Sequence, residues 1–151
     1  MEFKIDATPV FDMANRWNGA GTIVREELAS GITRLGKQTE AFGKREVPVV
    51  THTLQRSITS SNASPGRLVS EIGTQGVPYA RPVHDGAAPH VIVPVNKKAL
   101  FWPGAAHPVR RVNHPGNRAN PFLKRALMLV RPLIVPEMRA VMQRVAARLG
   151  G

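Results

Sequence analysis

Apolar positions separated by threes, fours and sevens follow one another over the first third of the chain. This spacing places them on one face of a helix with 3.6 residues per turn. Thr8-Pro9 precedes the run and is typical of a helix start, because proline suits the first helical position. We therefore expect an amphipathic helix over residues 9–44, with a weak point at Gly19 and Gly21. Its apolar positions are Val10, Met13, Trp17, Val24, Leu28, Ile32, Leu35 and Phe42.

Shorter apolar runs between turn signals fill the middle of the chain. Residues 54–59 and 67–73 flank a segment rich in Ser, Asn, Pro and Gly, and this arrangement predicts a hairpin. Residues 90–93 and 99–102 are the next strand candidates. Eight prolines fall between residues 78 and 121, and proline cannot donate to a sheet ladder, so these strands should be short, edge-placed or interrupted. Together the runs predict an antiparallel sheet over residues 54–102.

Residues 103–120 lack apolar periodicity and predict a loop that orders fully only against a partner. Asn120-Pro121 then repeats the helix-start signal, and Pro132 and Pro136 should kink or restart the helix that follows, over residues 121–149. The order of helix, sheet, loop and helix predicts an α+β fold in a single domain of 151 residues. The apolar stripe of the last helix is Phe122, Leu123, Ala126, Leu127, Val130, Met138, Val141, Met142, Val145 and Leu149.

Composition adds limits to this outline. Only 5% of the residues are aromatic, and the chain has 13 Pro and 13 Gly, so the core should be aliphatic and the loops many. The absence of cysteine excludes disulfides and thiolate metal sites, which suits a reducing cytoplasm. Neither a signal-peptide pattern at the N-terminus nor an apolar run of about 20 residues is present, so we expect neither secretion nor a membrane span.

The net charge of +11 is concentrated in the last third of the chain. Residues 1–95 carry 10 − 9 = +1, whereas residues 96–151 carry 11 − 1 = +10. This asymmetry indicates either a polyanionic partner or a solvated basic helix face. Because Phe101 and Trp102 form the one aromatic pair among these cations, we expect no base-stacking platform and no sequence-specific readout. The candidate phosphate contacts are Lys97, Lys98, Arg110, Arg111, Arg118, Lys124 and Arg125.

Catalytic and ligand-binding patterns are missing. The five histidines do not occur at metal-ligand spacing with carboxylates, the serines lack a nucleophile elbow, and the glycines form no phosphate-binding loop. We therefore expect no enzyme, no cofactor and no metal. The least favoured alternative is a hydrolase that uses His84, Asp85 and His114.

Three blocks within residues 54–127 resemble the tail-component family of long-tailed bacteriophages, also described as neck, tail-completion or head–tail joining proteins. Residues 54–58 are similar to a Gly-x-Leu-x-x-Ser-Ile strand opening, although His52-Thr53 stands where Thr-Gly is usual. Residues 72–86 are similar to a Val-Gly-Thr-x-x-x-Tyr-Ala-x-x-Val-Glu-x-Gly signature. The third block, residues 96–102 and 112–123, is similar to a Leu-Phe-Trp and His-Pro-Gly-x-x-x-x-Pro-Phe-Leu run.

The resemblance implies a small α+β fold in which a long N-terminal helix and a C-terminal helix pack on an antiparallel sheet. It also implies a protein that works as a ring between the head connector and the tail tube. The leading hypothesis is accordingly a structural virion protein that is assembled in the bacterial cytoplasm and placed in the neck or tail. Its partners would be further copies, head-connector or stopper proteins, tail-terminator or tail-tube proteins, and DNA in the channel. The alternative is a basic DNA-binding or packaging accessory protein. The expected assembly contacts are Phe101, Trp102, Arg110, Arg111, His114 and Arg118, because aromatics and arginines dominate interface hot spots.

Overall fold

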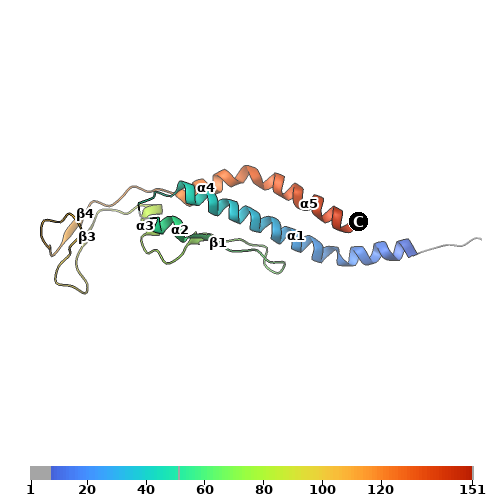
Figure 1. Cartoon of the computed structure of the whole chain (residues 1–151), viewed down its shortest axis with the longest axis horizontal. Helices are drawn as coiled ribbons and strands as arrows, with labels where there is room; N and C mark the ends of the chain where they lie inside the picture. The colour runs from blue at the N-terminus through green and yellow to red at the C-terminus, as the bar shows by residue number, and fades with distance from the viewer. Residues whose placement is uncertain (1–7, 51, 151) are drawn as a thin grey trace, which may run out of the picture.

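The computed structural model describes residues 8–50 and 52–150, with side chains from residue 18 onward. The molecule is elongated (Figure 1). Helix α1 (Thr8–Glu46) forms its spine and is continuous through Gly19 and Gly21, so the expected weak point does not divide it. The predicted helix over residues 9–44 is confirmed. The expected apolar positions Val10, Met13 and Trp17 lie outside the described side chains.

The C-terminal helices fold back along α1 as an antiparallel partner (Figure 1). They comprise α4 (Phe122–Val130), the 3-10 turn η1 (Arg131–Leu133) and α5 (Ile134–Gly150). Pro132 lies in η1, so the predicted kink is confirmed at the residue whose missing N–H disfavours an α-helical turn. The predicted cap is wrong: Pro121 occupies the cap position, and Asn120 instead accepts a hydrogen bond from Arg125.

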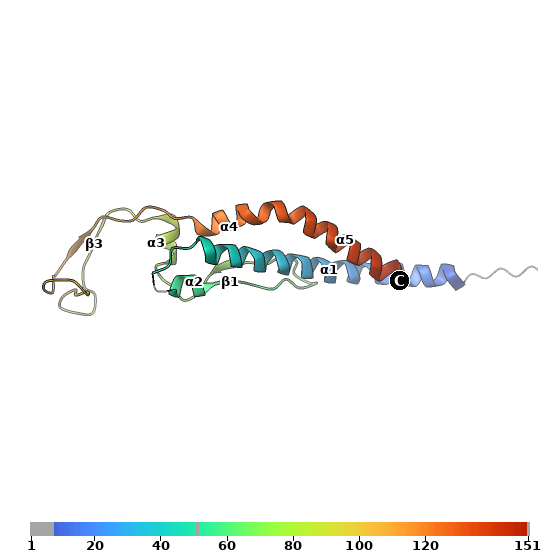
Figure 2. The same ribbon diagram turned by 45° about the horizontal axis from the view of Figure 1, so that its top comes forward.

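A helix–strand unit packs on a different side of α1 from α4 and α5 (Figure 2). It contains α2 (Thr53–Ser57) followed by β1 (Ile58–Ser60) and β2 (Ile72–Thr74), which pair antiparallel with Ile58 opposite Thr74. The predicted hairpin is therefore confirmed, but its strands are shorter than predicted. Residues 54–57 are helical rather than extended, because His52 adopts a left-handed turn (φ 58°) and its carbonyl accepts the Arg56 N–H at 2.9 Å.

The main core lies where these layers meet. Phe122 from α4 and Ile58 from β1 are fully buried, and Leu54 and Ala80 close the cluster. Ala80 begins α3 (Ala80–Asp85), the short helix that leads out of the core. Burial of each large side chain contributes roughly 1.5–3 kcal/mol, so this cluster fixes α2, β1, α3 and α4 on α1.

The remaining strands, β3 (His90–Ile92) and β4 (Val112–His114), form a second hairpin away from the helices (Figure 1). Two small sheets thus replace the single sheet expected over residues 54–102. The segment predicted as a loop, residues 103–120, contains the three-residue strand β4. The predicted strand over residues 99–102 is reduced to one bridge between Leu100 and Val109, flanked by Pro103 and Pro108, which cannot extend a ladder. Within the described residues, none of the helices has the length and apolar character required to cross a bilayer.

Candidate interaction arm

Residues 87–119, here named the arm, connect α3 to α4 and project beyond the helical body (Figure 1). Every residue from 86 to 120 is exposed or half-buried, whereas Ala80 and Phe122 on either side of this segment are buried. A two-stranded hairpin without a core of its own is marginally stable in water. The arm thus depends on contacts at its base, and its whole length is accessible to solvent.

Two glycines hold the base of the arm closed. Gly86 (φ 84°) and Gly116 (φ 81°) have left-handed backbones, a conformation that residues with a Cβ rarely adopt. They flank a bridge in which Ala87 N–H donates to Asn117 C=O at 3.0 Å and Asn117 N–H donates to Ala87 C=O at 2.9 Å. A Cβ on Gly116 would collide with the backbone of Ala87 and Ala88. Both glycines fall in the resemblance blocks, so that pattern includes positions that the arm requires.

The histidines of the hairpin face each other across the strands. His90 and His114 are register partners with ring centroids 5.0 Å apart. His90 Nδ1 donates to the Ala88 carbonyl at 2.9 Å, whereas His114 Nδ1 accepts the Gly116 N–H at 3.0 Å. His114 therefore carries its ring proton on Nε2, which leaves no free nitrogen lone pair to bind a metal. The two rings therefore pack against each other across the hairpin.

All six residues expected to make assembly contacts lie on the arm. Phe101 and Trp102 are 67% and 46% exposed beside the Leu100–Val109 bridge. Arg110 and Arg111 follow that bridge, and Arg118 lies next to the base at Asn117. His114 is half-buried against His90. The structure thus brings the six to one element, but it distributes them from base to tip.

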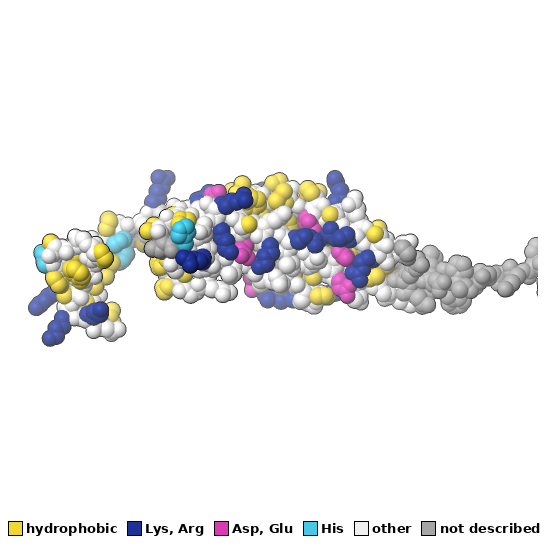
Figure 3. Space-filling view, in the orientation of Figure 1, with side chains coloured by type: hydrophobic (Ala, Val, Ile, Leu, Met, Phe, Trp, Pro, Cys, Tyr) yellow, Lys and Arg dark blue, Asp and Glu magenta, His cyan; other side chains and the backbone are white. Residues whose placement is uncertain are grey.

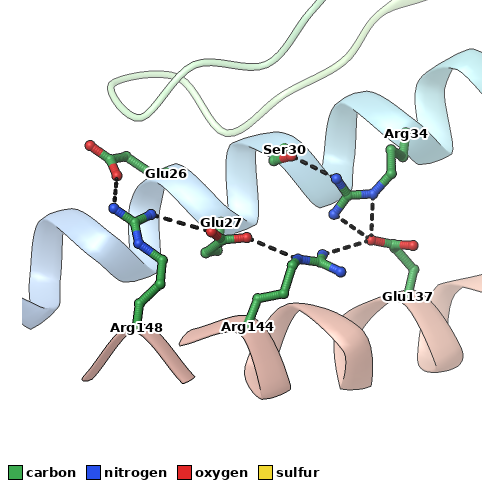
Figure 4. Close-up of polar contacts among 7 residues, drawn as sticks. All are labelled: Glu26, Glu27, Ser30, Arg34, Glu137, Arg144 and Arg148. Carbon is green, nitrogen blue, oxygen red and sulfur yellow. Dashed lines mark hydrogen bonds and ion pairs between the residues drawn. The ribbon is translucent and has the colours of Figure 1, made fainter. Parts of the chain in front are cut away.

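The basic residues of the last helix are placed differently. Arg144 donates to Glu27 at 2.9 Å and to Glu137 at 3.0 Å, and Arg148 donates to Glu26 at 2.8 Å and to Glu27 at 3.2 Å (Figure 4). Arg34 completes the ladder by an ion pair with Glu137 at 2.7 Å. These side chains join α1 to α5, so much of the basic charge of α5 is neutralised within the chain.

Every acidic side chain that the structure describes takes part in an ion pair. Each of these seven carboxylates contacts at least one basic side chain of the same chain. By contrast, the arm contains no acidic residue, and the described pairs include none of its five cations. Figure 3 shows basic side chains projecting from the arm without acidic neighbours. The arm cations are Lys97, Lys98, Arg110, Arg111 and Arg118.

A second exposed surface runs along the outside of α4 and α5. Val135 and Met142 are spaced by seven residues, which places them on one face of α5, and the exposed Met128 lies on the preceding helix α4. Figure 3 shows apolar side chains gathered over this edge. Leu127 and Met142 belong to the predicted apolar stripe but are exposed, because α1 covers only the face on which Val141 and Val145 are buried. This surface, here named the helix strip, comprises Leu127, Met128, Leu129, Ile134, Val135 and Met142.

The residues of the hydrolase alternative are divided between two places. His84 Nδ1 lies 2.7 Å from Asp85 Oδ1, and this hydrogen bond lowers the pKa of Asp85. The His84 ring packs edge-on against Phe122, whereas His114 stacks on His90. His84 Nε2 is buried without a hydrogen-bond partner among the residues described. No group of three or more metal-ligating side chains occurs in residues 18–50 and 52–150.

Comparison with known proteins returned no match to a family model, to a curated protein or to a solved structure. The resemblance of residues 54–127 to phage tail components therefore stays a prediction. The two unpartnered surfaces, the arm and the helix strip, are the features of this chain from which a function can be argued.

Proposed function

We propose that this chain is a structural subunit of a bacteriophage neck or tail, which oligomerises into a ring at the head–tail junction and carries out no catalysis. The observation that carries the proposal is the presence of two different exposed surfaces on one elongated subunit. One surface can contact the next copy, and such contacts close into a ring if the rotation allows it, while the other surface remains free for the proteins on either side of the ring. The motif resemblance supplies the phage context.

The helix strip is the part of the ring interface that contacts neighbouring copies. Its side chains are large and apolar, and Val135 and Met128 are 63% and 61% exposed. Contiguous apolar patches on a subunit mark contact sites, because their exposure to water is unfavourable. In the assembled ring these residues would be covered by the next subunit, and α1 would remain their support from within.

The arm extends this contact to adjacent rings. Phe101 and Trp102 are the apolar anchors, and Arg110, Arg111 and Arg118 supply charge around them. His114 keeps the hairpin ordered through His90. The adjacent proteins would be a head connector or stopper on one side and a tail terminator or tail tube on the other. The finished protein would then belong to the virion.

The experiment is a mass measurement by light scattering on the purified chain over a range of concentrations. The proposal expects a defined oligomer that Met128→Ser/Val135→Ser/Met142→Ser reduces to monomer. A matched control, Val49→Ser/Val50→Ser/Val69→Ser, changes three exposed apolar residues outside the strip and should leave the oligomer intact. A chain whose mass is unchanged by the strip variant would contradict this interface.

The assembly role is tested in the phage that encodes the chain. Alanine at Phe101, Trp102, Arg110, Arg111, His114 and Arg118 together should prevent joining of heads and tails. Unchanged virion assembly and infectivity with all six replaced would reject the proposal. A second candidate function, a basic DNA-binding or packaging accessory protein, is supported by the unpaired arm cations. It would replace the first if the chain remained monomeric with its neighbours present and bound DNA.

A further inference from the structure

We propose that the arm is a duplex-DNA-binding ribbon whose cations contact the sugar–phosphate backbone without reading its sequence. This goes beyond ring assembly, and it rests on the proposed function only in that a ring would bring several arms to one duplex. The aromatic residues of the arm and its cations need not face the same partner. The residues that carry the inference are Lys97, Lys98, Arg110, Arg111 and Arg118.

The charge of the arm has no described counterpart in another copy of this chain. The seven described carboxylates are already paired within the subunit. Arg111 illustrates the contrast, since it donates a hydrogen bond to the neutral amide oxygen of Asn113 at 3.2 Å. Five exposed cations on an element that has no carboxylate repel one another. A partner that brings its own negative charge relieves this repulsion.

The ion pairs also show which part of the basic last third of the chain keeps its positive charge unpaired. Residues 122–150 carry six basic residues and one acidic residue, 6 − 1 = +5. Glu26, Glu27 and Glu46 from α1 pair with Arg148, Arg144 and Arg125, which reduces this to 5 − 3 = +2. The arm keeps 5 − 0 = +5. The polyanion-binding element is therefore the arm rather than the basic helix.

Shape and residue type favour duplex DNA over an acidic protein. A two-stranded ribbon fits the major groove, and the arm is such a ribbon at β3 and β4. Its cations are distributed from Arg118 at the base to Lys97 and Lys98 beyond β3, so they can contact phosphates at several positions along a duplex. Protein interfaces, by contrast, are depleted of lysine and concentrate charge at a rim.

The test is fluorescence anisotropy with the full chain and a 30-base-pair duplex of arbitrary sequence, between about 50 and 200 mM salt. Each phosphate contact contributes about 0.9 to the slope of log affinity against log salt, so five contacts predict roughly 500-fold weaker binding across this range. Replacing all five arm cations by glutamine should remove most of the slope and weaken binding at least about tenfold at the lowest salt.

A matched variant separates the arm from net charge. Five exposed cations of the helical body, none of them in a described ion pair, are replaced by glutamine, so both variants lose five charges. The inference expects this control to retain the salt slope within about one contact. All ten side chains are exposed, so both variants should fold, and circular dichroism checks this. The control positions are Arg45, Arg56, Lys124, Arg131 and Arg139.

Three results would overturn the inference: absent or salt-independent binding, equal loss in the two variants, or arm-dependent binding to poly-L-glutamate that is tighter than binding to the duplex. The last result would assign the arm to an acidic protein surface. Light scattering on the same samples without DNA reports on the ring separately. A monomer that binds duplex through its arm contradicts the proposed ring alone, whereas a ring indifferent to DNA contradicts the arm inference alone.

Discussion

Arg144 of α5 donates a hydrogen bond from Nε to Glu27 Oε2 of α1 at 2.9 Å, across 117 positions of sequence. The same guanidinium reaches Glu137, and Arg148 reaches Glu26 and Glu27 (Figure 4). The hydrogen bond from Arg144 is the largest cause that lowers the pKa of Glu27, and Glu27 in turn raises the pKa of Arg144. This ladder fixes the register of α5 against α1.

Glu27→Gln should lower the Tm by a few degrees, because it removes the carboxylate that Arg144 and Arg148 share. The control is Glu71→Gln, since Glu71 pairs with Arg67 where both side chains are more than 60% exposed. Such surface pairs contribute little to stability, so the control should change the Tm by no more than about a degree. Thermal unfolding measures both variants, and equal shifts would contradict a structural role for the ladder.

The lowered pKa of Glu40 predicts how the stability of the fold depends on pH. Hydrogen bonds, first from Lys44 and then from Ser60, lower the pKa of Glu40 to about 2 from 4.5 in spite of partial burial. A lowered pKa contributes stability that is present above pH 4.5 and is lost as the pH falls through the range toward 2. Glu40→Gln should therefore unfold more readily than wild type at pH 7, with a difference that narrows toward pH 2. Denaturant titrations at the two pH values measure it, and a constant difference would reject the assignment.

The long helices could be predicted from sequence, because their apolar periodicity extends over many turns. Residues 54–57 could not, since a run of four residues is too short to separate a helix from a strand by period. Residues 54–57 are helical because of the left-handed backbone of His52 and the burial of Leu54 against Phe122 and its neighbours. The same applies to β4, whose three residues pair with β3 across a proline-interrupted segment.

The candidate site was predicted in part. Phe101, Trp102 and the four other proposed contacts do lie on one element, which composition and the resemblance pointed to. The helix strip was missed, because Met142 continues the same spacing as the buried Val145 and Val141, and only the position of α1 separates the two faces. The sequence also could not show that Arg144 forms ion pairs whereas Arg110 forms none among the described residues. One carboxylate partner of Arg144 lies on α1, which is far away in the sequence.

Gly116→Ala should open the base of the arm without unfolding the helices. The added Cβ would lie 2.8 Å from the Ala88 carbonyl carbon and meet the Ala87 oxygen, at a residue with φ 81°. Hydrogen exchange should then become faster at the Ala87 and Asn117 amides and stay slow in α1. Gly104→Ala is the control, since Gly104 also has a positive φ (94°) but no heavy atom lies within 4 Å of its added Cβ. Similar exchange at the base in both variants would contradict a steric requirement at Gly116.

Gly31 of α1 packs closely against α5. A Cβ there would lie 2.5 Å from Cγ2 of Val141, a side chain that is itself buried. Alanine gains about 1 kcal/mol over glycine in a helix, but overpacking costs about 1–3 kcal/mol. Gly31→Ala should therefore destabilise the fold, whereas Gly21→Ala, in the same helix with open space around its Cβ, should stabilise it by about 1 kcal/mol.

A double-mutant cycle isolates the contact between Gly31 and Val141. Val141→Ala alone leaves a cavity, and Gly31→Ala alone overfills the same space, so the two changes should compensate each other in one chain. The double variant should lose less unfolding free energy than the two single variants lose in sum, by about 1 kcal/mol or more. Unfolding in urea measures these free energies. Additive effects, or a Gly31→Ala variant as stable as Gly21→Ala, would mean that α5 lies further from α1 than the structure places it.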